Sequence, residues 1–169
     1  METSGLIVMA RGAEMQRQLS MLFEQRKVAK RYVAVVDGQV LPECGEINAP
    51  LITDWPNRPR QMIDPQMGKP SLTRYQRIDY DAARDISRVE LEPLTGRSHQ
   101  LRVHTSASGW PIFGDNIYGS GPRFGEPTLH LHSREIVIPI SRNKEPVRVV
   151  APAPKHLHER LRMCGWNGE

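Results

Sequence analysis

Arginine, histidine and glutamine side chains crowd the segment Arg97-Ser98-His99-Gln100-Leu101-Arg102-Val103-His104. The segment follows an alternating stretch, residues 88–94, that is typical of a strand, and it opens a helix that we expect to end at Gly109. Gly96 is expected to form the intervening turn and Ser98 to cap the helix. A helix start with free amides and nearby guanidinium groups favours an anion. That anion is either an RNA phosphate or a carboxylate of the protein itself.

Arg102 is the residue of this segment that most needs a partner. A single arginine at a helix start is more often merely solvated, but Arg97, His99, Gln100 and Arg102 crowd about one and a half turns here. Leu101 and Val103 flank Arg102, so we expect its stem to be partly buried. A buried guanidinium is stable only beside a carboxylate. The identity of that carboxylate is the main question that the sequence raises.

Trp55 marks a second candidate for binding. Residues 53–69 are expected to form a long polar loop that prolines stiffen, and loops of this length are commonly functional or disordered. Arg58 and Arg60 follow Trp55, so an indole able to stack on a base lies beside charges able to bind phosphate. This combination favours contact with RNA.

Composition describes an ordinary globular chain with a moderate basic excess. The 169 residues are 25% charged and 38% hydrophobic, with a net charge of +4 and a pI of about 9.3. The length fits one domain over residues 1–169. The charge favours a polyanionic partner without proving one.

Several classes of protein lack support in the sequence. Cys44 and Cys164 have neither metal-ligand spacing nor a disulfide framework, which favours a reducing, cytoplasmic location. No apolar run reaches the roughly 18 residues that span a bilayer, and we expect no signal peptide and no membrane association. No P-loop or dinucleotide fingerprint is present, and we expect neither a cofactor nor a metal.

Apolar periodicity predicts an α+β fold with a mixed, largely antiparallel sheet and flanking helices. Tyr32 lies at the basic entrance of a predicted strand, where such a tyrosine is ordinarily a half-buried packing residue. His130 and His132 share one face of another, and we favour a hydrogen-bonded structural role over metal binding. The predicted strands are residues 5–10, 30–38, 71–80, 86–94, 129–132, 136–140 and 147–150, and the other predicted helices are residues 11–27 and 154–163.

The chain resembles the RluA family of RNA pseudouridine synthases, especially its dual-specificity type for ribosomal and transfer RNA. The arginine-rich segment 97–104 is highly specific to the family, and the Asp-Trp-Pro-Asn-Arg-Pro run points to the RluA type. The resemblance implies the catalytic fold of that family. The segments that carry it are residues 2–8, 30–34, 51–59, 68–70, 95–104 and 111–115.

The resemblance also implies a reaction. A uridine already in RNA is flipped from its stack, detached from its sugar at N1, turned and rejoined through C5, without a metal or organic cofactor. Tyr32 matches the tyrosine that packs on the flipped uracil, and Arg102 matches the arginine that pairs with the catalytic aspartate. The expected partner is 23S-type ribosomal RNA, a tRNA anticodon stem-loop or both, bound by a monomer. The expected RNA contacts are Trp55, Arg58, Arg60 and Arg97.

The family's aspartate belongs to a His-Arg-Leu-Asp motif, which the resemblance locates just before the first residue. Asp54, Asp64, Asp79 and Asp115 lie in other contexts. We therefore expect an N-terminally incomplete chain, in which Arg102 lacks its carboxylate partner and the 169 residues alone are inactive. One alternative is a non-catalytic RNA-binding module whose affinity falls steeply with salt. The other is an inert, poorly soluble fragment.

Overall fold

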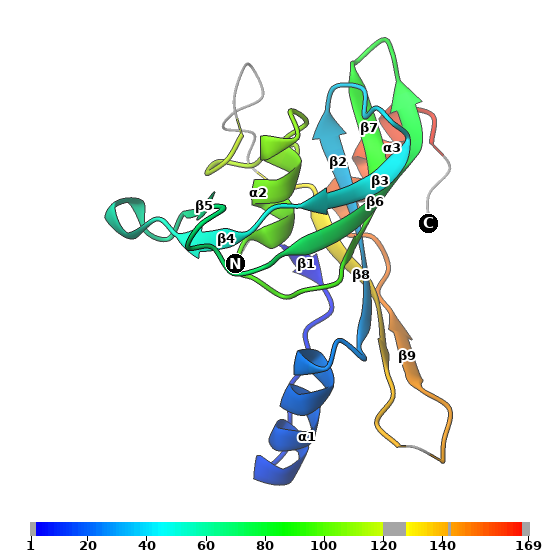
Figure 1. Ribbon diagram of the computed structural model, residues 1–169. Coiled ribbons are helices and arrows are strands. Elements are labelled where there is room, and N and C mark those ends of the chain that lie inside the picture. Colours follow the sequence, from blue (N-terminus) through cyan, green and yellow to red (C-terminus); the bar gives the residue numbers. More distant parts are fainter. Residues whose placement is uncertain (1–2, 120–127, 142, 167–169) are drawn as a thin grey trace.

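The structure is a computed structural model that describes residues 3–119, 128–141 and 143–166. A twisted sheet forms its centre, and helices lie beside it (Figure 1). The helical segments are α1 (Ala13–Glu24), α2 (Gln100–Ala107), α3 (Lys155–Met163) and the 3-10 turn η1 (Trp55–Asn57). The strands are β1 (Ser4–Gly5), β2 (Ala29–Asp37), β3 (Cys44–Asn48), β4 (Leu51–Thr53), β5 (Gln61–Ile63), β6 (Leu72–Asp81), β7 (Ile86–Pro93), β8 (Leu131–Ile138) and β9 (Val147–Val150).

The main sheet has the order β1-β8-β2-β7-β6-β3, and β9 pairs with β8 outside this path. The β1–β8 pair is parallel, and the other pairs of this sheet are antiparallel. The α+β class with a mixed, largely antiparallel sheet is therefore confirmed. β4 and β5 form a separate two-stranded sheet.

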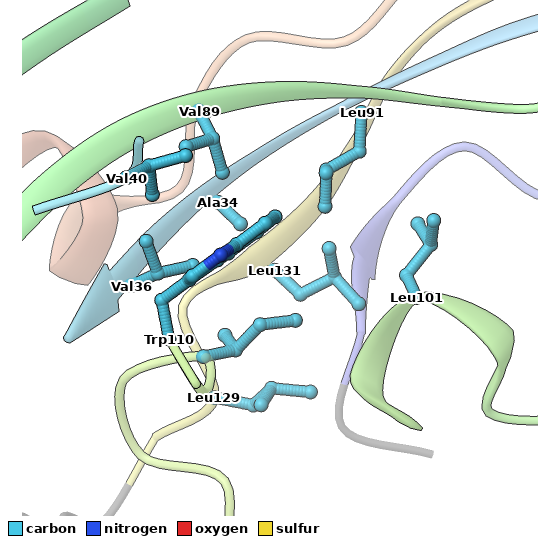
Figure 2. Packing of buried hydrophobic residues seen from close by; sticks show 10 residues of the cluster. Ala34, Val36, Val40, Val89, Leu91, Leu101, Trp110, Leu129 and Leu131 are labelled. Carbon is cyan, nitrogen blue, oxygen red and sulfur yellow. The ribbon is translucent and has the colours of Figure 1, made fainter. Parts of the chain in front are cut away.

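The period of two along β2 divides the core between the faces of the sheet. Ala34 and Val36 point to the face that α2 covers, where Leu101 of α2 and Leu131 of β8 also pack (Figure 2). Val35 points to the other face, where it joins a cluster that includes Leu157 and further residues of α3. The helix that carries the arginine-rich segment is thus held against the sheet by apolar contacts.

Helix α1 lies apart from the main core, near the far end of β8 (Figure 1). Leu19 is its buried residue and packs with Val28, Ile136 and Ile138. The predicted strand over residues 5–10 was wrong. Pairing with β8 stops at Gly5, and Ile7 and Met9 are 72% and 80% exposed.

Three other expectations need correction. The predicted strands 129–132 and 136–140 are largely one strand, β8, because its pairing with β2 runs through the polar residues between them. β3 was missed, since its short sequence lacks a run of β-branched residues. The hairpin of β6 and β7 and the helices α1 and α3 were predicted correctly. No helix in the described ranges has the length and apolarity needed to cross a membrane.

Candidate functional site

A cleft of about 780 Å³ opens between β1, β2, the start of α2 and the turn before it. Its volume is within the range of roughly 300–1,000 Å³ that is usual for small-molecule sites. Tyr32, Arg97 and Arg102 all line it, together with Lys30. The fold therefore brings Tyr32 of β2 to the same cleft as Arg97 and Arg102, which lie about 70 positions further along the chain.

Tyr32 reaches the cleft from β2 at an irregularity in the sheet. Arg31 pairs with Glu135 but Tyr32 pairs with Ser133, so Arg134 is the extra residue of a bulge in β8. Bulges re-aim nearby side chains and are common next to active sites. The half-buried ring packs on the edge of the α2 core cluster, which leaves the tyrosine supported from one side.

The partner of Arg102 is Asp115. The Arg102 Nε donates to Asp115 Oδ2 at 2.8 Å and its Nη2 donates to Oδ1 at 2.7 Å, a bidentate pair. Both residues are buried, with Arg102 only 6% exposed and Asp115 1%. The expectation that Arg102 lacks a carboxylate partner within the chain was wrong. The reason is that the turn after α2 brings Asp115 back beneath the helix, which sequence spacing alone did not indicate.

Asp115 is held as a carboxylate by more than the arginine. Burial alone would raise its pKa, but the Arg102 hydrogen bonds and the backbone N–H groups of Tyr118 and Ile117 outweigh burial and lower the pKa. Those amides donate to Oδ1 at 2.9 Å each. The guanidinium that faces the cleft is therefore oriented by a fixed anion beneath it.

The start of α2 differs from the expectation. The helix begins at Gln100 with His99 as its N-cap residue, so the assignment of Ser98 was wrong. His99 has a left-handed backbone with φ of 52°, which is uncommon for a residue other than glycine. Gly96 has no such φ, and its freedom is not what makes the turn. The Gln100 Oε1 instead accepts bonds from Thr95 Oγ1 at 2.7 Å and from the Arg97 N–H at 3.0 Å.

Buried hydrogen bonds dock α2 on the sheet. Gln100 Nε2 donates to the Leu72 carbonyl at 3.1 Å and to Thr73 Oγ1 at 3.0 Å. His104 Nδ1 lies 2.9 Å from Thr73 Oγ1, and its Nε2 lies 3.0 Å from the Ala49 carbonyl. Burial lowers the pKa of His104, opposed by its bond with Ala49. These polar residues of the arginine-rich segment are structural and hold the cleft wall in place.

Trp55, Arg58 and Arg60 lie outside the cleft, on the hairpin of β4, η1 and β5. The predicted loop over residues 53–69 was wrong at Gln61–Ile63, which pairs with Leu51–Thr53, whereas residues 54–60 form the connection between these two strands. Trp55 is 62% exposed, and the Arg58 guanidinium carbon lies 4.1 Å from the centre of its ring. The indole and its arginine are thus presented to solvent as a stacked pair.

Tyr118 connects this hairpin to the cleft wall. Its hydroxyl accepts the Gln61 N–H of β5 at 2.8 Å and lies 2.8 Å from His99 Nδ1, and His99 lines the cleft. The Tyr118 ring lies 5.6 Å from the Arg60 guanidinium carbon and 5.5 Å from that of Arg102. The stretch of residues 110–119 was expected only to pack under the site, and Tyr118 was not among the site residues selected from the sequence.

His130 and His132 are both buried and hydrogen-bonded. His130 Nδ1 lies 2.8 Å from the Thr128 carbonyl, and His132 Nδ1 lies 3.0 Å from Ser4 Oγ. The predicted hydrogen-bonded role is confirmed by these contacts. Across the three described ranges, no group of three or more histidine, cysteine or acidic side chains has a metal-binding arrangement.

Comparison with known proteins adds the family context. Residues 1–107 match the family of RNA pseudouridylate synthases. The chain is 47% identical over 139 residues to the dual-specificity RNA pseudouridine synthase RluA of Escherichia coli strain K12, and 42% identical over 139 residues to that of Haemophilus influenzae. Each alignment covers 82% of this chain and 63% of the relative, so the chain spans less than two thirds of their length.

Two human structures share the fold. The chain superposes on RNA Pseudouridylate Synthase Domain Containing 4 with a TM-score of 0.74 and 24% identity, over 91% of this chain and 69% of that one. For RNA Pseudouridylate Synthase Domain Containing 1 the TM-score is 0.71 and the identity 27%, over 94% and 74%. The sheet and helices described above are therefore those of known pseudouridylate synthase domains.

Proposed function

The chain belongs to the RNA pseudouridylate synthase family, and on that premise we propose that the whole protein isomerises uridine to pseudouridine in structured RNA. The single observation that carries the proposal is that Tyr32 and Arg102, from β2 and α2, line the same cleft. An aromatic ring and a buried guanidinium facing one hollow suit a flipped base and an anionic group beside it.

The proposed reaction needs no electron donor or acceptor. The bond between the sugar C1′ and N1 of the base breaks, the base turns, and C1′ bonds to C5. The proton on C5 leaves and N1 gains one, so atoms and charge balance. Tyr32 is proposed to pack on the uracil and to lie where the C5 proton is moved. Arg102, oriented by Asp115, is proposed to hold the catalytic carboxylate ionised and oriented, whether that carboxylate attacks C1′, attacks the base or assists elimination to a glycal.

That catalytic carboxylate is proposed to come from a His-Arg-Leu-Asp motif, which the 169 residues do not contain. Asp115 does not suit the role, because its oxygens are buried and already accept bonds from Arg102 and two backbone amides. We therefore propose that this chain supplies the base-facing and RNA-facing residues, and that the 169 residues alone bind RNA without isomerising it.

Docking of the RNA is proposed to use the exposed hairpin together with the cleft rim. Trp55 and Arg58 offer a stacking surface, and Arg60 and Arg97 add positive charge on the path between hairpin and cleft. The relatives are named dual-specificity RNA pseudouridine synthases, which supports RNA as the substrate here. Ribosomal RNA, transfer RNA or both are proposed on the family resemblance stated above. A monomeric state and a cytoplasmic location stay predictions from the sequence.

The test uses the protein encoded by the longest in-frame reading that contains these 169 residues. RNA hairpins labelled with tritium at uridine C5 should release tritium on conversion, and Arg102→Lys should keep RNA binding while turnover falls at least a hundredfold. The 169-residue chain should bind the same RNA without releasing tritium. Absence of release by the longer protein on both ribosomal and transfer RNA hairpins would contradict the proposed activity. Binding without release by either protein would favour an RNA-binding module instead.

A further inference from the structure

Lys30 lines the same cleft as Tyr32, and the proposed reaction assigns it no role. The two residues are two positions apart on β2, so their side chains leave the strand on the same side. Lys30 Nζ also approaches the turn before α2, since a Cβ built on Gly96 would lie 4.0 Å from it. The ammonium group is therefore set between the base-facing tyrosine and the turn that carries Arg97.

The contacts of Lys30 are few for a cation in this position. Its Nζ donates to the Thr95 carbonyl at 3.4 Å and lies 5.9 Å from the centre of the Phe23 ring. No carboxylate of the described residues lies within 4.0 Å of the Lys30 ammonium group. Arg102, across the cleft, has a bidentate aspartate partner instead.

Burial makes this arrangement costly in the free protein. Desolvation lowers the pKa of Lys30, because the charged form loses water without gaining an anion. An ammonium group has three N–H donors, and one long bond to a carbonyl leaves it short of acceptors. A ligand that brings a negative charge into the cleft would replace the favourable interactions with water that the Lys30 ammonium group lost on burial. A neutral ligand would not compensate for that desolvation to the same extent.

We propose that Lys30 binds a backbone phosphate of the RNA, next to the uridine that Tyr32 packs on. This inference rests on the proposed function, because the phosphate enters the cleft with its nucleotide. Lys30 then acts as a binding residue of the target nucleotide, while Trp55 and Arg58 contact RNA outside the cleft. A lysine suits a phosphate there because it acts as a compact point charge and does not need the planar geometry of an arginine pair.

The first test measures binding of the 169-residue chain to an RNA hairpin with one loop uridine, across a series of salt concentrations. Lys30→Met should bind about tenfold more weakly, since it loses a bond between two charged groups. The negative slope of log affinity against log salt should become shallower by about 0.7, the value for one phosphate contact on a single strand. Lys30→Arg should keep the wild-type slope. Lys155→Met, which removes an exposed lysine of α3, is the matched control and should change neither quantity.

The second test neutralises the phosphate instead of the lysine. Hairpins carry a methylphosphonate on the 5′ or the 3′ side of the loop uridine, and one of them should weaken wild-type binding about as much as Lys30→Met does. That substitution should cost the Lys30→Met variant little more, because the two changes remove the same contact. The proposal would be overturned if each methylphosphonate, 5′ or 3′, weakened RNA binding by wild type and by Lys30→Met equally. A loss of affinity in Lys30→Met would then indicate that Lys30 contacts the base instead.

The outcomes separate this inference from the proposed function. If wild type binds and Trp55→Ala weakens binding while Lys30→Met behaves as Lys155→Met does, the phosphate contact is wrong and the RNA interface stands. If wild type binds no hairpin at all, both fail. Thermal unfolding of Lys30→Met should match wild type or exceed it, because methionine removes a desolvated charge from the cleft wall.

Discussion

Arginine has two opposite environments in this structure, one on α2 at the wall of the cleft and one on the β4–β5 hairpin. Arg102 on the wall is buried and fixed by two hydrogen bonds to Asp115. Arg58 on the hairpin is exposed and lies over the ring of Trp55, and no described carboxylate lies within 4.0 Å of it. The first arginine is held by the protein's own anion, whereas the second is ready for an anion from outside.

Under the proposed function, this difference assigns Arg102 to the support of chemistry and Arg58 to the docking of RNA. A group that faces reacting atoms must already be oriented before the substrate arrives, and a buried partner provides that orientation. A group that grips flexible RNA gains more from exposure and from a flat ring. Tyr118 contacts both regions, since its hydroxyl bonds the hairpin and its ring lies near Arg102. The two regions thus differ in the burial and the partners of their arginines, and the Tyr118 side chain contacts both.

The largest effect is expected from breaking the buried pair. Asp115→Asn leaves the Arg102 charge buried beside a neutral amide, so we expect a loss of about 3–5 kcal/mol in the free energy of unfolding. Chemical denaturation measures it. Arg148→Ala is the control, because its bidentate bonds to Glu135 have similar lengths but lie at the surface, and it should change stability little. Equal losses in both variants would remove the distinction between the wall and the surface.

The same pair should show an acid signature that the hairpin lacks. The folded pKa of Asp115 lies below its ordinary value of 3.8, so its ionised form stabilises the native state above pH 3.8. That contribution is lost as pH falls through the folded pKa. The stability difference between wild type and Asp115→Asn should therefore be largest above pH 4 and shrink below it, whereas Trp55→Ala should show a difference that does not depend on pH. A constant difference for Asp115→Asn would argue against an ionised pair.

A change on the β4–β5 hairpin is expected to affect RNA binding. Trp55→Ala should weaken the binding of an RNA stem-loop by about 1–3 kcal/mol, the usual value for loss of one base stacked on an aromatic ring. The native fold should be unaffected, because the indole is mostly exposed. Filter binding measures the affinity, and Glu14→Ala on α1 is the surface control. If both variants bind equally well, Trp55 is not an RNA contact.

The smallest effect on stability and RNA binding is expected at Tyr118, which joins the β4–β5 hairpin to the cleft wall. Tyr118→Phe removes the hydroxyl that bonds Gln61 and His99 but keeps the ring beside Arg60 and Arg102. We expect a loss of about 1 kcal/mol in stability and a few-fold weaker RNA binding. A double-mutant cycle with Trp55→Ala should show coupling, since the hairpin is then no longer anchored to the cleft wall. Strict additivity would mean that hairpin and wall act independently.

Much of this organisation could be predicted from the sequence where a pattern is local. The alternation in residues 71–80 and 86–94 predicts the β6–β7 hairpin, and apolar spacing predicts α1 and α3. The crowding of charge in the sequence singled out Arg97 and Arg102, whereas Tyr32 was selected only through the family resemblance, and the structure brings all three to one cleft. Their roles in binding and chemistry stay predictions.

What could not be predicted depends on contacts between distant segments. Asp115 became the partner of Arg102 only because the turn after α2 folds back, and one sequence carries no sign of that return. From the sequence, Lys30 was only the basic first residue of a predicted strand, whereas in the structure it lines the cleft. Ser98 was a reasonable cap by residue type, but the helix begins at Gln100 and His99 occupies the N-cap position instead. Side-chain competition of this kind is decided by three-dimensional packing.

The most direct test of the account is photocrosslinking of the 169-residue chain to an RNA hairpin that carries 5-bromouridine at its loop uridine. Irradiation joins C5 of the base to a residue in contact with it, and mass spectrometry of the digested protein identifies that residue. The account predicts an adduct on Tyr32 that Tyr32→Phe relocates only within the cleft-lining residues. Adducts confined to α3 or to the β8–β9 hairpin, with none in the cleft, would contradict it.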